Sequence, residues 1–132
     1  MIGLDTNVLV RYFAQDEPKQ AVAAAGLIEH RLSRDEPGHV NLVTLAEVCW
    51  VLKRLYDAGR DELVQVLEHL LAAPHIVVER RAQVRKAVQN FGASSAGFGD
   101  CLIAQLNLEA GCSSTLTFDR GAAKQPGFSL LA

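Results

Sequence analysis

Several features that would mark a particular class of protein are scarce or missing in this chain of 132 residues. Its three cysteines, Cys49, Cys101 and Cys112, form no CxxC pair, which disfavours a zinc knuckle and a secreted disulfide framework. The four histidines show no HxxH or HExxH spacing, so they do not predict a metal site. We expect the cysteines to be buried thiols in a reducing cytoplasm, and His30 and His69 to lie on surface helices.

A large excess of charge of one sign and long apolar runs are missing too. Thirteen Lys and Arg against 15 Asp and Glu give a net charge of -2, which excludes a protein that holds nucleic acid by bulk positive charge. No run approaches the ~20 apolar residues of a membrane span, and no basic leader precedes the first apolar stretch. Because 49% of the residues are hydrophobic, we expect one soluble, cytoplasmic domain over residues 1–132.

Short apolar runs alternate with amphipathic segments along the chain. The runs predict strands at 1–4, 39–43, 75–79, 114–118 and 128–131, and the amphipathic segments predict helices at 7–14, 19–34, 44–56, 63–71, 84–91 and 100–111. This alternation predicts an α/β fold, a three-layer α/β/α sandwich around a mainly parallel central sheet. In such folds ligands bind beyond the carboxyl ends of the strands.

Four acidic residues lie where they can project toward that edge of the sheet. Asp5 and Asp119 each end a predicted strand, whereas Glu47 and Asp100 lie in the first turns of predicted helices. Each also has an ordinary structural explanation. Asp5 could be an Asx-type helix cap, and Glu47 could close a capping box with Thr44. Asp100 could be favoured by the helix macrodipole, and Asp119 could be a turn residue.

The helix around Glu47 has two different faces. Its predicted core face carries Leu45, Val48, Cys49, Leu52, Leu55 and Tyr56. Glu47 lies on the other side of the helix with Trp50, Val51 and Arg54, and no cation stands three or four residues after it. A routine helix-surface salt bridge therefore does not account for Glu47, and its face is a candidate partner surface.

Four motifs in this sequence resemble those of PIN-domain nucleases, in particular VapC-type toxins. They are the opening stretch 2–12 (IGLDTNVLVRY), residues 43–48 (VTLAEV), residues 98–104 (FGDCLIA) and residues 116–120 (LTFDR). All four occur in the family's order and together span nearly the whole chain. The main departure lies around Gly97, where relatives often carry an additional acidic residue. Gly97 and Gly99 therefore bear on whether a second metal position forms.

The resemblance implies a Mg²⁺- or Mn²⁺-dependent endoribonuclease, the toxin of a type II VapBC-like toxin–antitoxin module. Asp5, Glu47, Asp100 and Asp119 would form its acidic pocket, with Asp5 and Asp100 as direct metal ligands. Carboxylates that converge in one pocket repel each other unless a cation is bound. Oxygen-only ligands favour Mg²⁺ or Mn²⁺ over zinc.

Further residues follow from the same motifs. Thr6, Asn7 and Thr117 are expected to orient the carboxylates, although local caps and strand hydroxyls explain them equally well. Arg11, Arg120 and Lys124 lie near the acidic motifs and are expected to contact RNA phosphates. No aromatic stacking platform stands out.

The resemblance also implies partners, namely a VapB-type antitoxin and a second copy of the chain in a homodimer. Two other interpretations stay open. One is a PIN domain that has lost catalysis and binds only RNA or protein. The other is a phosphoacceptor receiver domain, which would show paired acids at the end of the first strand, where this chain has the single Asp5.

Overall fold

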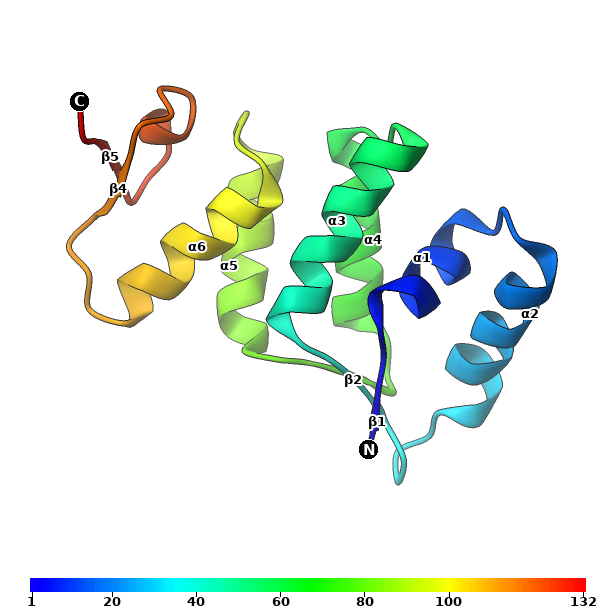
Figure 1. Ribbon diagram of the computed structural model, residues 1–132. Coiled ribbons are helices and arrows are strands. Elements are labelled where there is room, and N and C mark those ends of the chain that lie inside the picture. The colour runs from blue at the N-terminus through cyan, green and yellow to red at the C-terminus, as the bar shows by residue number, and fades with distance from the viewer. The chain divides into compact units, whose positions relative to one another are not determined.

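The computed structural model describes residues 1–132, which divide into two compact units, Met1–Arg81 and Ala82–Ala132. Figure 1 labels most of the helices and strands of both units. Each unit contains parallel strands and helices. The predicted α/β class is therefore confirmed. No helix has both the length and the apolar character needed to cross a membrane.

The first unit contains a parallel sheet of three short strands in the order β1-β2-β3. These are β1 (Ile2–Gly3), β2 (Gly38–Val40) and β3 (Ile76–Val78). Ile2 is in register with Gly38, and Gly38 with Ile76. Val40, Ile76 and Val78 are buried, which explains why these short apolar runs form strands.

Two helical segments separate β1 from β2. The first is α1 (Thr6–Ala14), and the second is α2 (Pro18–Gly26), which continues into a π-helical turn, η1 (Leu27–Arg31). The prediction of one helix up to residue 34 is wrong because Leu32 adopts an extended conformation and buries its side chain. At the end of α1, Gln15 adopts the left-handed conformation with a φ of 55°.

The helices α3 (Leu42–Tyr56) and α4 (Arg60–Ala72) lie between β2 and β3. Both carry leucines that are less than a tenth exposed. The strand predicted up to residue 43 ends at Val40, because α3 begins at Leu42 instead of at Thr44. The Asn41 side chain caps this helix by accepting from the backbone N–H of Thr44. The prediction that Leu55 faces the core is also wrong, because its side chain is exposed.

The second unit contains most of α5 (Arg81–Gly92), all of α6 (Phe98–Glu109), the short η2 (Ala122–Lys124) and two strands. The strands β4 (Thr115–Thr117) and β5 (Phe128–Leu130) pair in parallel. The rings of Phe91 and Phe98 pack edge to face with their centroids 5.9 Å apart. Lys86, in the middle of α5, pairs with Glu109 at the end of α6 at 3.7 Å, so these two helices are joined at two places.

The cysteines behave differently from one another. Cys49 and Cys101 are buried as predicted, but Cys112 is exposed, so the prediction for Cys112 is wrong. Cys112 follows Gly111, which has a φ of 96° in the turn after α6. Burial raises the pKa of the Cys49 thiol to about 12, which keeps it protonated and unreactive at neutral pH.

Candidate active site

Asp5 stands at the carboxyl end of β1 and at the start of α1. Its backbone carbonyl accepts from the N–H groups of Val8 and Leu9, at 3.1 and 3.4 Å. Its side chain is exposed and makes no capping hydrogen bond. The Asx-cap explanation of this residue is therefore wrong for the carboxylate, whose oxygens remain available to a ligand.

Glu47 lies in the second turn of α3, because that helix begins at Leu42. The capping-box explanation is wrong as well, since Asn41 provides the cap. Glu47 is exposed, and its Oε1 accepts a hydrogen bond of 2.9 Å from the hydroxyl of the buried Thr6. Because Thr6 follows Asp5 directly, this bond joins the first two acidic motifs across 41 residues of sequence. Asn7, the next residue of α1, is exposed.

In the second unit, Asp100 is the third residue of α6, so the helix begins two residues earlier than predicted. It is half-buried and is the acidic residue of the helix's first turn. A helix N-terminus favours a negative charge there. The glycines near Asp100, Gly97 and Gly99, both have space for a side chain. A Cβ atom at Gly97 would lie 4.0 Å from Asp100 Oδ2, and one at Gly99 would meet nothing within 4 Å.

Asp119 follows β4 and holds the next turn together. Its Oδ1 accepts from the backbone N–H groups of Gly121 and Ala122, at 2.7 and 3.2 Å. The Thr117 hydroxyl accepts from the backbone N–H of Asp119 at 3.0 Å. The turn explanation of Asp119 is thus confirmed. These bonds orient the carboxylate through one oxygen and leave Oδ2 for another partner.

The four acidic residues are divided equally between the two units. Neither unit contains by itself a group of three or more His, Cys, Asp or Glu side chains that could hold a metal ion. The donors are nevertheless suited to a hard divalent cation, because all of them are carboxylate oxygens. The Asp5 side chain makes no capping bond, whereas Glu47 and Asp119 each use one oxygen in an internal hydrogen bond.

The three cations expected to contact phosphates differ in their surroundings. The Arg11 guanidinium donates to Gln20 at 2.7 Å, Tyr56 at 3.0 Å and Asp16 at 3.3 Å. Arg120 and Lys124 are exposed and take part in no ion pair. These two side chains can therefore turn toward a ligand, whereas Arg11 is held by its neighbours.

Sequence reasoning missed the network around Arg11, which joins α1, the start of α2 and the end of α3. The Tyr56 hydroxyl donates to Asp16 at 2.7 Å. This hydrogen bond, together with the Arg11 guanidinium, holds the pKa of Asp16 below its ordinary value. No signal in the sequence pairs Tyr56 with Arg11, because 45 residues separate them.

Parallel strands and helices with carboxylates at their junctions define an α/β protein whose chemistry is expected at the carboxyl ends of its strands. The PIN domain family matches residues 2–127, a range that includes parts of both units. The chain belongs to the PIN domain family, whose members are in general metal-dependent nucleases. No curated protein sequence matches it.

Proposed function

We propose that this protein is a Mg²⁺- or Mn²⁺-dependent endoribonuclease and the toxin of a VapBC-like toxin–antitoxin module. The observation that carries the proposal is the hydrogen bond from Thr6 to Glu47. It fixes a carboxylate of the second acidic motif beside the residue that follows Asp5. Neither local capping nor a helix-surface ion pair accounts for Glu47, so a role at a site is the better explanation.

The four carboxylates have different parts in this proposal. Asp5 and Asp100 ligate the cation, in keeping with the uncapped side chain of Asp5 and with the place of Asp100 in the first turn of α6. Glu47, held by Thr6, either ligates the cation or accepts a proton from the attacking water. Asp119 acts through the oxygen that does not cap its own turn. When bound, the cation binds a phosphodiester oxygen and lowers the pKa of a water.

Three further residues have roles in this proposal, two that contact RNA and one that orients a carboxylate. Arg120 and Lys124 contact RNA phosphates, since both are exposed and without an acidic partner. Thr117 orients Asp119 through the backbone N–H of that residue. The proposed antitoxin and the homodimer follow from the resemblance of the motifs to VapC-type toxins, and the protein is expected to act in the cytoplasm.

The decisive experiment measures RNA cleavage by the purified chain with Mg²⁺ or Mn²⁺, with and without EDTA. Asp5→Asn and Asp100→Asn each remove a charge while preserving side-chain size. Asp35→Asn is the matched control, because Asp35 is an exposed acid outside every helix and strand. We expect cleavage to fall about 100-fold or more for each of the first two variants, as removal of a metal ligand or its support does.

The outcomes separate the alternatives. Cleavage that resists EDTA, or that survives both Asp5→Asn and Asp100→Asn, would overturn the proposed site. Metal binding by calorimetry without cleavage of any RNA in a broad pool would favour a PIN domain that only binds RNA or protein. If Asp35→Asn lowered cleavage as much as the other two variants, the loss would reflect the change in net charge and not the loss of a site residue.

A further inference from the structure

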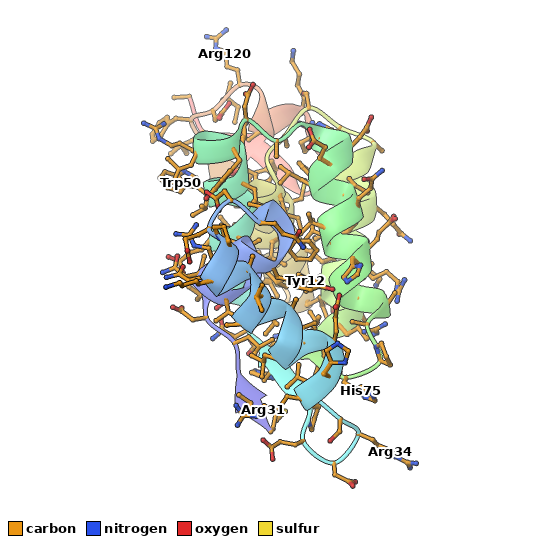
Figure 2. The ribbon with its side chains drawn as sticks, turned by 90° about the vertical axis from the view of Figure 1, so that its right-hand side faces the viewer. Tyr12, Arg31, Arg34, Trp50, His75 and Arg120 are labelled. Carbon is orange, nitrogen blue, oxygen red and sulfur yellow. The ribbon has the colours of Figure 1, made fainter.

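The outer face of α3 carries an exposed aromatic side chain beside two cations. Trp50 is 61% exposed and Leu55 is 69% exposed. Together with Lys53 and Arg54, they line a shallow hollow of about 520 Å³. Figure 2 shows Trp50 at the margin of the ribbon beside α3. A single exposed apolar residue is common on protein surfaces, but here an indole and a leucine lie together with two cations around one hollow.

The position of Trp50 along α3 relates it to the candidate active site. Glu47, Trp50 and Arg54 follow each other at three- and four-residue spacing, so they share one helix face. At about 1.5 Å per residue, Trp50 lies about 4.5 Å further along the helix axis than Glu47, and Arg54 about 10.5 Å further. A ligand that extends along this helix face from Glu47 would therefore reach Trp50 first and Arg54 next.

The charges on this face are not neutralised by the protein. The ion pairs in the structure are Arg11–Asp16, Arg31–Glu36 and Lys86–Glu109, so neither Lys53 nor Arg54 has an acidic partner. The Arg54 guanidinium lies 5.6 Å from the centre of the Trp50 ring. An indole and a guanidinium plane both stack on unpaired bases, and both cations can meet phosphates.

We propose that Trp50, Lys53 and Arg54 form a subsite for single-stranded RNA, in which Trp50 stacks on an unpaired base and the two cations contact the adjoining phosphates. The proposal rests on the proposed function for its substrate class. A second copy of the chain fits this face less well. A two-fold interface would bring the same patch of both copies together, and hence four positive charges, from Lys53 and Arg54 of each copy, close to one another.

The single tryptophan makes a direct test possible, because the intrinsic tryptophan fluorescence of the chain comes from Trp50 alone. The probe is an oligouridylate, added in EDTA so that the proposed metal-dependent cleavage cannot proceed during the measurement. We expect its addition to quench the fluorescence. Trp50→Phe keeps a stacking ring and should retain most of the affinity measured by anisotropy. Trp50→Leu keeps only apolar area and should weaken binding about 5-fold or more.

Charge is tested separately with Lys53→Gln and Arg54→Gln. Each substitution should lower the slope of log affinity against log salt by about 0.7, the value for one phosphate contact on a single strand. Val22→Ala is the matched control, because Val22 is an exposed apolar residue of α2, 73% exposed. It should leave both the affinity and the salt slope unchanged.

Several results would overturn the subsite, namely no quenching on addition of the oligonucleotide, a Trp50→Leu affinity equal to that of wild type, or unchanged salt slopes. Dissociation of a dimer by Trp50→Leu in sedimentation, with RNA affinity intact, would assign the face to a second copy. Failure of the proposed function looks different. Quenching together with a weaker affinity of Trp50→Leu, in a chain that cleaves no RNA, would refute the nuclease and retain the RNA-binding face.

Discussion

Replacing Thr6 by Val removes the hydroxyl that holds Glu47 while keeping the size and branching of the side chain. Thr6 is buried, with 8% exposure, so the new methyl group is buried as well. Glu47 is exposed, so its Oε1 regains a water when the 2.9 Å bond is lost. The net loss of such a bond is at the low end of about 0.5–1.5 kcal/mol. Burial of the methyl offsets part of that loss, so stability should fall by less than about 1 kcal/mol.

The effect on catalysis should be much larger than the effect on stability. A side chain that orients a metal-site carboxylate typically contributes about 10–100-fold to activity, which is about 1.4–2.7 kcal/mol of transition-state stabilisation. We therefore expect kcat/KM for RNA cleavage to fall by that factor in Thr6→Val. Thr6→Ser keeps the hydroxyl and loses only a methyl, so it should cleave within a few-fold of wild type.

Two measurements check this reasoning, namely urea unfolding followed by circular dichroism and initial cleavage rates at saturating Mg²⁺. Wild-type activity in Thr6→Val would refute the role assigned to the Thr6–Glu47 bond. An equal loss in Thr6→Ser and Thr6→Val would show that packing of the methyl group, and not the hydroxyl, matters. A fraction of unfolded Thr6→Val large enough to explain the whole loss of cleavage would also refute the role of this bond.

Two further predictions concern Gly97 and Asp16. Gly97→Asp places a carboxylate where a Cβ atom lies 4.0 Å from Asp100 Oδ2, and it should lower the Mn²⁺ concentration that half-saturates cleavage. Gly97→Asn is its uncharged control, and equal effects of the two would contradict a charge role. Tyr56 and Arg11 lower the pKa of Asp16 from its ordinary value of 3.8. The ionised Asp16 therefore stabilises the fold at pH values above 3.8, and this stabilisation is lost as the pH falls below 3.8. Wild type should therefore have a higher Tm than Asp16→Asn at pH 7, and the gap should shrink below about pH 4; a constant gap would exclude this titration as its source.

Much of the fold could be predicted from the sequence because apolar residues that recur at the period of a helix or strand are usually the buried ones. Val84, Ala87, Val88 and Phe91 were predicted to share one helix face, and all four are buried. The same reasoning failed at the start of α3. There the run His39–Val43 looked like a strand, but the Asn41 side chain caps a helix that takes in Val43. A capping bond outweighs the strand preference of one β-branched residue.

The candidate site was predicted less completely, because its contacts join distant parts of the chain. Motif positions named Asp5, Thr6 and Glu47, but only the structure shows which hydroxyl meets which carboxylate. The commitment of Arg11 to Tyr56 has no local signal, because it depends on how α1 meets α3. The sequence predicted that Trp50 and Arg54 share the non-core face of α3, and Trp50 is exposed there, but only the structure shows that the Arg54 guanidinium lies over the indole ring.

The left-handed residues Gln15, Asp57 and Arg80 bear on how this protein can be engineered. Each has a φ of 50° or 55°, a region that glycine occupies without penalty and that costs other residues about 1 kcal/mol. Gln15 and Asp57 end the helices α1 and α3, which begin near Asp5 and Glu47. Glycine at Gln15 or Asp57 would therefore add stability at the carboxyl end of each helix, away from Asp5 and Glu47. Site variants that lower the stability of the protein can then be studied in a more stable protein in which they remain folded.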